Sequence, residues 1–331
     1  MAAAVDRIAG ASGFSGVIRV DGPEGLAVER AFGLAHRGLG IANTATTRFG
    51  IASGGKGLTA LVVVSLVQEG ALGLATPARE VLGADLPLIG DDVTVEHLLA
   101  HRSGIGDYLD EEAGRPITDY VLPVPVHELA TTEAFLPVLD GYPPKFRAGE
   151  RFSYCNAGYV VLALIAERVA GQPFPDLVRR RVCDPAGMAD TEFLRSDEPT
   201  AGAALGYLAD EGLRTNVFHL PVRGTGDGGV YSTAADIHSL WAAFLGGRIV
   251  AQPWVAEMVK ARSDVPSESK RYGLGLWLHR SGAAVILEGY DAGASFRTLH
   301  DPTTRSTATV LSNTSEGAWT LAPYLEEALA P

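Results

Sequence analysis

Apolar positions along the chain form several segments with helical spacing. Residues 58–67 are apolar on nearly every side, so they predict a helix that is buried all round. Residues 157–170 carry apolar side chains at a helical period and stop at Gly171, which predicts an amphipathic helix with a glycine end. Shorter helices are predicted at 94–101, 233–245 and 321–329.

Strand patterns occupy the two ends of the chain. Residues 15–22 and 26–33 are separated by a Gly-Pro turn and predict a hairpin. Near the other end, short β-type runs follow one another at hairpin spacing, at 272–278, 284–288, 294–299 and 306–311.

This order of elements predicts an α+β fold of the sandwich type. We expect an antiparallel sheet that is built from both termini and flanked by helices, with a mostly helical insertion. The sheet domain is expected to comprise residues 1–75 and 265–331, and the helical domain residues 76–264. The active site is expected in the cleft between them.

Composition narrows the class of protein. The 331 residues are 47% hydrophobic and carry a formal charge of −12, so a globular protein is expected and nucleic acid is an unsuitable partner. The N-terminus lacks a basic segment followed by an apolar core, and no apolar run is long enough to cross a membrane. We therefore expect a cytoplasmic protein without a membrane partner; its oligomeric state is left open. Its two cysteines suggest neither a disulfide framework nor a metal site.

Ser53 and Lys56 are the first candidates for chemistry. The sequence Ser53-Gly-Gly-Lys56 stands where the buried helix begins, so a lysine three residues on can reach the serine hydroxyl. Burial at the foot of this helix should lower the pKa of the lysine, which suits it to activate a serine nucleophile. Ser267-Glu-Ser-Lys270 repeats the spacing, but it lies in a polar run and is interpreted as a solvated loop. On this stretch alone, catalysis and chance occurrence have similar weight.

Tyr154 and Asn156 form the second candidate pair. They lie two residues apart just before the helix at 157–170. In an extended segment both side chains would enter one cleft, the phenol as a proton shuttle and the carboxamide as a hydrogen-bond donor to a substrate carbonyl. The alternative is a turn in which Asn156 caps the helix and Tyr154 packs, and taken alone this pair favours the alternative.

Three other patterns have simpler interpretations. His97 and His101 are four residues apart, but the glutamate expected between metalloprotease histidines is absent, so packing or capping is favoured over a metal. The glycine-rich stretch 224–229 lacks a preceding strand in a βαβ unit and is interpreted as a loop. Ile51 occupies the first glycine position of a Gly-x-Ser-x-Gly elbow, which disfavours an α/β-hydrolase.

Together the two candidate pairs resemble the penicillin-recognising serine hydrolases, the superfamily of class C β-lactamases, DD-peptidases and related esterases. Further segments resemble the motifs of that superfamily in the same order. They are Leu98-Leu-Ala-His101-Arg-Ser-Gly-Ile105, the segment 146–159 around Tyr154, Cys183-Asp-Pro-Ala-Gly-Met188-Ala-Asp-Thr191, Gly228-Gly-Val-Tyr-Ser232-Thr-Ala-Ala-Asp236 and Tyr272-Gly-Leu-Gly275. The resemblance implies a β-lactamase/transpeptidase-like fold.

The third motif of the superfamily, Lys-Thr-Gly or His-x-Gly on a strand, has an altered counterpart here. The best alignment puts Glu288 where the cation is expected, followed by Gly289, Tyr290 and Asp291, and these four are predicted to contact the substrate. A glutamate there would repel a substrate carboxylate, so a neutral or cationic ester or amide is expected to suit the site better. The alternative, of similar weight, is that Glu288 is a strand residue that faces solvent.

The resemblance implies a serine hydrolase that forms an acyl-enzyme on a small ester or amide, with β-lactams and D-amino-acid peptides among the possible substrates. Ser53 would be the nucleophile, Lys56 and Tyr154 would transfer its proton, and Asn156 would orient the acyl group. Backbone N–H groups of Ser53 and of about Asp291 would hold the oxyanion. No metal or organic cofactor is implied. The alternative is a catalytically weak or inactive member of the superfamily that binds a ligand in the same cleft.

Overall fold

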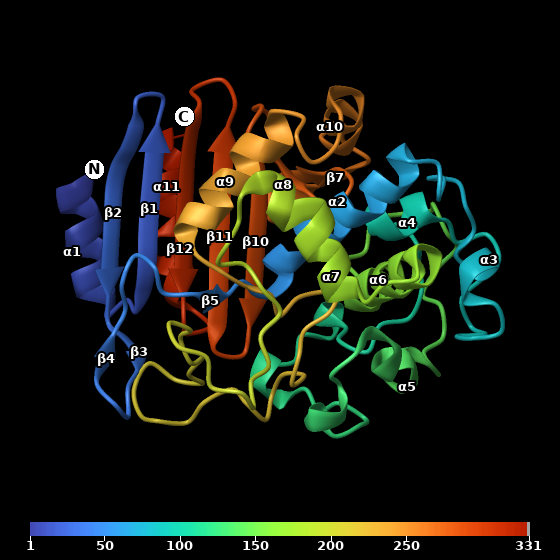
Figure 1. The fold of residues 1–331 in the computed structure, drawn as a ribbon, viewed down its shortest axis with the longest axis horizontal. Helices are drawn as coiled ribbons and strands as arrows, with labels where there is room; N and C mark the ends of the chain where they lie inside the picture. Colours follow the sequence, from blue (N-terminus) through green and yellow to red (C-terminus); the bar gives the residue numbers. More distant parts are fainter. Residues whose placement is uncertain (330–331) are drawn as a thin grey trace.

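The computed structural model describes residues 1–329, and its centre is one eight-stranded antiparallel sheet (Figure 1). The strand order is β2-β1-β12-β11-β10-β9-β8-β7, so the first hairpin of the chain joins the last one through the β1–β12 pair. The strands are β1 (Gly16–Gly22), β2 (Gly25–Phe32), β7 (Ser263–Val265), β8 (Lys270–Tyr272), β9 (Trp277–His279), β10 (Val285–Asp291), β11 (Ala294–Asp301) and β12 (Ser306–Ser312).

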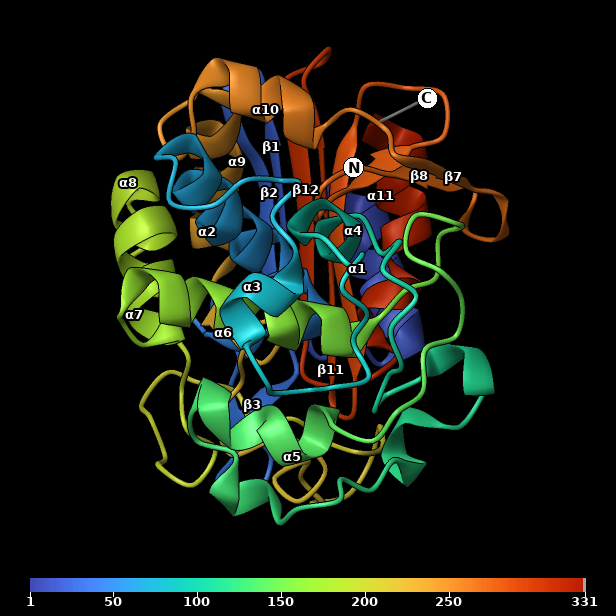
Figure 2. The same ribbon diagram turned by 90° about the vertical axis from the view of Figure 1, so that its right-hand side faces the viewer.

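Helices cover both faces of this sheet. Neighbouring strand residues point to opposite sides, and apolar residues on each side pack against a different set of helices. On one face Ile286 packs in a cluster with α1 (Ala2–Ser12) and α11 (Ala322–Leu329). On the other face Leu287 belongs to the larger core, which contains the longest helices (Figures 1 and 2). The remaining helices are α2 (Gly55–Gln68), α3 (Ala78–Leu82), α4 (Val95–Leu99), α5 (Leu136–Leu139), α6 (Asn156–Ala170), α7 (Phe174–Val178), α8 (Asp184–Ala186), α9 (Ala234–Leu245) and α10 (Gln252–Met258).

Helix α2 lies in the interior, and its N-terminal end carries Lys56 directly after the turn that contains Ser53. Every residue from Gly55 to Val67 is buried, as the apolar pattern of this segment predicts. Glycine allows a close approach to the sheet, because a Cβ on Gly57 would lie 2.6 Å from a methyl carbon of Leu287. Helix α6 packs alongside α2 and places its own first turn near the same point.

The predicted fold class is confirmed: the sheet is antiparallel, comes from both ends of the chain and has helices on its two faces. The predicted strand at 272–278 is wrong in detail, because the chain turns at Gly275 (φ 78°) and forms β8 and β9 instead. Helix α1 and strand β7 were not predicted. The division into a sheet domain and a helical domain at residues 75 and 265 stays a prediction.

The interpretation of Ser267–Lys270 as a solvated loop is wrong for its last residue. Lys270 begins β8 and is only 9% exposed, because its ammonium turns inward to the carboxylate of Glu288. Among residues 1–329, no helix combines the length and the apolar character that a bilayer crossing needs.

Gly289 provides a test of the contact between β10 and the turn before α2. A Cβ there would lie 2.2 Å from the Ile51 carbonyl oxygen and 2.8 Å from the Ser53 nitrogen, both of them backbone atoms that cannot move away separately. We expect Gly289→Ala to lower the free energy of unfolding by about 1–3 kcal/mol, as overpacking typically does.

The control is Gly10→Ala in α1, where nothing lies within 4 Å of the added carbon. Alanine in a helix should there raise the free energy of unfolding by about 0.5–1 kcal/mol. Urea unfolding measures both variants. Equal stability of Gly289→Ala and the wild type would contradict the close approach.

Candidate active site

Ser53 lies in a 3₁₀ turn, Ala52–Gly54, between the short strand β5 (Phe49–Gly50) and α2. Strand β5 pairs with β6 (Tyr231–Ser232), and the Ile51 N–H donates to the Val230 carbonyl at 3.0 Å, so the approach to the turn is fixed. The half-buried Ser53 therefore stands at the N-terminal end of α2, where unpaired N–H groups and the helix dipole favour negative charge.

Lys56 is 2% exposed and its Nζ has three hydrogen-bond acceptors. They are Ser53 Oγ at 2.9 Å, Asn156 Oδ1 at 2.7 Å and the Asp227 carbonyl oxygen at 2.7 Å. Burial lowers the pKa of Lys56, against the opposing effect of nearby carboxylates, Asp227 foremost. A neutral amine retains two N–H groups for Asn156 and Asp227 and turns its lone pair to Ser53.

Tyr154 lies in the extended segment just before α6, and its ring centroid is 5.0 Å from Lys56 Nζ. Burial raises the pKa of the Tyr154 phenol well above its ordinary value and Glu111 adds to the rise, while a hydrogen bond with Ser53 offsets part of it. The phenol is therefore neutral and can donate a proton. The structure brings Ser53, Lys56 and Tyr154 together.

Asn156 is the first residue of α6 and is buried. Besides accepting from Lys56, it donates through Nδ2 to the Leu109 carbonyl at 2.9 Å and to Glu111 Oε1 at 3.1 Å. These two bonds to Leu109 and Glu111 fix the orientation of the Asn156 carboxamide. It does not cap α6, because the position before the helix belongs to Cys155.

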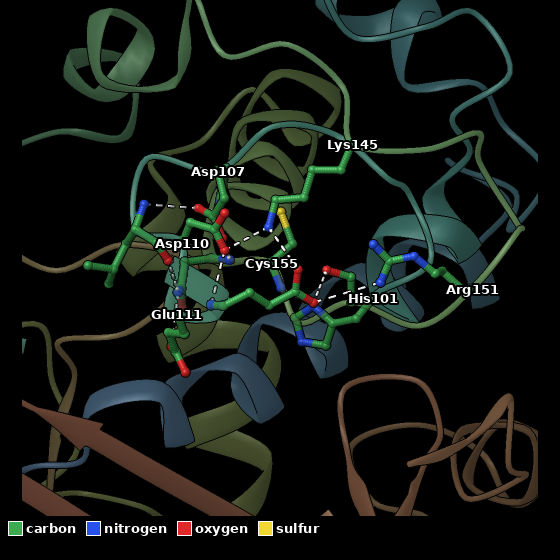
Figure 3. Close-up of polar contacts among 12 residues, drawn as sticks. His101, Asp107, Asp110, Glu111, Lys145, Arg151 and Cys155 are labelled. Atoms are coloured by element: carbon green, nitrogen blue, oxygen red, sulfur yellow. Dashed lines mark hydrogen bonds and ion pairs between the residues drawn. The ribbon is translucent and has the colours of Figure 1, made fainter. Parts of the chain in front are cut away.

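The cap of α6 comes instead from Asp107, a residue that the sequence did not indicate. Its carboxylate accepts the N–H groups of Asn156 at 2.6 Å and Ala157 at 3.0 Å (Figure 3). Burial raises the pKa of Asp107 to about 6, although these hydrogen bonds act in the opposite direction. No sequence signal could have located it, since a cap supplied from 49 residues away has no local pattern.

The glycine-rich stretch 224–229 is a loop, as predicted, and it also contributes to the site. Besides the Asp227 carbonyl that Lys56 contacts, Gly226 accepts a hydrogen bond from Thr59 Oγ1 at 2.6 Å. A Cβ on Gly228 would lie 2.9 Å from the Ala52 carbonyl oxygen. Glycine thus lets this loop approach the turn that carries Ser53.

Two cavities meet at Ser53, and both are rich in carboxylates. The wider one measures about 640 Å³ and the narrower one about 90 Å³. The acidic residues that line one or both are Glu111, Glu112, Asp227, Asp264, Glu268, Glu288 and Asp291, against Arg151. Aromatic rings complete the wider cavity, from Phe152, Tyr154, Trp277, Tyr290 and Trp319.

The four predicted residues on β10 have different environments. Gly289 packs on the turn that contains Ser53, and Tyr290 is 41% exposed, with its hydroxyl donating to Glu316 Oε1 at 2.7 Å. Asp291 lines the narrower cavity, and burial raises the pKa of its carboxyl to about 7.

Glu288 also lines the wider cavity, but its carboxylate is not free to oppose a substrate. It accepts from Lys270 Nζ at 2.6 and 2.8 Å and from Arg297 at 2.8 Å. Gly289 faces Ser53, and strand neighbours alternate in direction, so Glu288 leaves the opposite face of β10. The expectation of an uncompensated negative charge at this position is therefore corrected.

The open edge of β10 offers a backbone donor next to Ser53. Strand β9 pairs with β10 only at Val285 and Ile286, so within residues 1–329 the later part of β10 has no strand on that side. Backbone groups alternate between the two neighbours, and the Ala284 carbonyl, which accepts from His279, faces β9. The N–H of Tyr290 then points to the open edge, whereas that of Asp291 points to β11. The donor expected at about Asp291 stays a prediction, and this alternation favours Tyr290 for it.

His97 and His101 do not share a site. Nδ1 of His97 accepts from the Thr94 N–H at 3.3 Å within the capping box of α4, as the capping interpretation requires. Nδ1 of His101 accepts from the Cys155 N–H at 3.0 Å.

Comparison with known proteins agrees with this geometry. Residues 2–329 match the Beta-lactamase family. The crystal structure of a penicillin binding protein from Bacillus halodurans matches with a TM-score of 0.91 and 34% identity, covering 98% of this chain and 99% of that one.

Two sequence relatives are longer proteins. The putative penicillin-binding protein PbpX of Bacillus subtilis is 26% identical over 270 residues, which are 80% of this chain and 62% of PbpX. Esterase EstB of Burkholderia gladioli is 33% identical over 183 residues, which are 51% of this chain and 44% of EstB. The resemblance seen in the sequence is confirmed, and because the family match runs through almost the whole chain, the protein belongs to the beta-lactamase family of serine hydrolases.

Proposed function

We propose that the protein hydrolyses a small ester or amide through an acyl-enzyme on Ser53. The observation that supports this most directly is the 2.9 Å contact between Lys56 Nζ and Ser53 Oγ, at a cavity that Tyr154 also lines. A serine hydroxyl next to a desolvated amine is an activated nucleophile, and the cavity gives a carbonyl compound access to it.

Acylation follows from the protonation states of these groups. Ser53 Oγ attacks the carbonyl carbon, and its proton passes to the neutral amine of Lys56 as the new C–O bond forms. Tyr154, whose raised pKa keeps the phenol protonated, gives its proton to the departing alcohol or amine as that bond breaks. The proton on Lys56 then restores the phenol.

The tetrahedral intermediate needs donors for its oxyanion, and the N–H groups of Ser53 and Tyr290 are proposed for this role. Water then attacks the acyl carbon, releases the carboxylic acid and returns the proton to Ser53. Asn156 holds Lys56 in place through the 2.7 Å hydrogen bond and orients the acyl group.

The charge of the cavities supports a substrate without a carboxylate next to the scissile bond. Carboxylates on several walls of the two cavities face a single arginine, Arg151. The carboxylates other than Glu288 would repel a negative substrate, whereas a neutral or cationic ester or amide would not meet this repulsion. Esterase EstB is named for ester hydrolysis, which agrees with this substrate class.

The test of the proposed function is intact-protein mass spectrometry with a panel of chromogenic esters, amides and β-lactams. We expect a burst of product and a mass increment of one acyl group per chain in the wild type, and neither in Ser53→Ala. Ser281→Ala, which changes an exposed serine, is the control and should behave as the wild type. Tight binding of these compounds without any burst in the wild type would instead support a ligand-binding protein.

The pH dependence of acylation tests Lys56 as the base. Only the neutral amine accepts a proton, so the acylation rate should fall as pH falls through the pKa of Lys56, which burial holds below its ordinary value of 10.5. Lys56→Arg should remove this limb of the profile and slow acylation by about a hundredfold or more. Burst kinetics at neutral to alkaline pH measure it, with the exposed Lys260→Arg as control. An unchanged profile in Lys56→Arg would exclude this role.

Glu288→Gln tests the charge balance of the wider cavity. The variant leaves Lys270 and Arg297 without their shared carboxylate, so carboxylate-bearing esters should gain about tenfold in kcat/KM relative to neutral esters. The variant should also lower the free energy of unfolding, because a mostly buried ion pair loses one partner. Glu24→Gln changes the net charge equally at an exposed turn and should leave the preference as it is. An unaltered preference in Glu288→Gln would contradict this account.

A further inference from the structure

His101 contacts the chain on both sides of Tyr154. Its carbonyl accepts the N–H of Ser153 at 2.9 Å, and its Nδ1 accepts the N–H of Cys155 at 3.0 Å, so the residues before and after Tyr154 are both bonded to one residue (Figure 3). His101 makes both bonds from a left-handed backbone, with φ 53°. Histidine, like asparagine, adopts this region more readily than most side chains.

The ring of His101 also supports the ring of Tyr154. It is 1% exposed, and its centroid lies 4.3 Å from that of Tyr154, with an angle of 32° between the planes. The ring centroids of Tyr159 and Tyr272 each lie 4.9 Å from that of His101, and the centroid of Phe152 lies 5.8 Å away. The phenol ring is therefore held by a packed aromatic group as well as by the fixed peptides.

The protonation state of His101 follows from its partners. Because Nδ1 accepts a hydrogen bond, the proton of the neutral ring is on Nε2, and no group in residues 1–329 accepts from that buried atom. Four aromatic rings pack around this imidazole, and such rings are weak acceptors. Burial and the nearby Lys56 lower the pKa of His101 well below its ordinary value, so the ring stays neutral and does not itself transfer a proton.

We propose that His101 is the positioning residue of Tyr154: it clamps the extended segment 153–155 and so fixes the phenol against Ser53 for acyl transfer. The inference rests on the proposed function for its effect on rate, but the clamp is a separate physical claim. Displacing a proton donor by about 1 Å can slow a reaction a hundredfold, so the loss of the clamp should be measurable.

Two variants separate the Nδ1 contact from the rest of the side chain. His101→Asn places an amide oxygen where Nδ1 was and suits the left-handed backbone, so the bond to the Cys155 N–H persists. His101→Gln places its amide near the Nε2 position and leaves that N–H unpaired. Both variants lose the imidazole ring, so the difference between them reports the Nδ1 contact. We expect the acylation rate per active site to be about ten- to a hundredfold lower in His101→Gln than in His101→Asn.

Active sites are titrated by the burst amplitude, so a variant that folds poorly loses amplitude but not rate per site. His127→Gln, which changes an exposed histidine that lines neither of the two cavities at Ser53, should leave both quantities unchanged. Equal rates per site in the wild type and His101→Gln, or equal losses in the two His101 variants, would overturn the proposal.

Hydrogen exchange at the Cys155 amide tests the clamp without any turnover. We expect slow exchange in the wild type and His101→Asn, and exchange at least tenfold faster in His101→Gln. If the wild type hydrolysed no compound of the panel, the acyl-transfer proposal would fail, while this exchange pattern would still support the clamp. Equal exchange in the three proteins would refute it.

Discussion

The site depends on the burial of one amino group, Nζ of Lys56. Lys56 lies at the foot of a helix that is buried along almost its whole length, and it is stable there because three oxygens form hydrogen bonds with its Nζ. Two of them come from Asn156 and Asp227, 100 and 171 residues away in the sequence. Burial makes these hydrogen-bond partners necessary, and it also lowers the pKa of the Lys56 amine. One cause therefore explains both why the amine needs its partners and why it can act as a base.

Local patterns were sufficient for the longest elements and for part of the site. The apolar run at 58–67 predicted α2 because a fully buried helix has no polar face, and Ser53 with Lys56 followed from helical spacing. Asp107, Asp227 and Lys270 could not be predicted, because each acts through tertiary placement. Asp227 contacts Lys56 through its backbone carbonyl, which every residue has, so its residue type does not indicate the contact. Lys270 lies in a polar run, and nothing in that run indicates that its side chain turns inward to Glu288.

Charge around β10 is balanced by residues from separate parts of the chain. Glu288 is bonded by Lys270 on β8 and by Arg297 on β11, and Arg297 also contacts Glu326 on α11 at 2.5 Å. Alternating charges in a mostly buried row compensate one another, whereas each alone would be costly to desolvate. The electrostatic potential at this part of the cavity wall therefore depends on all four charged residues and cannot be inferred from Glu288 alone.

The two sides of the cleft differ in how firmly they are built. Ser53 and Lys56 stand on a helix embedded in the main core, but the facing stretch contains 3₁₀ turns at 111–113, 117–119 and 126–128 that bury none of their own side chains. Such a stretch opens at a lower free-energy cost than the core and tolerates replacement of its residues. Evolution can therefore reshape which molecules enter the cleft by altering this side, while the reactive groups on the other side keep their geometry.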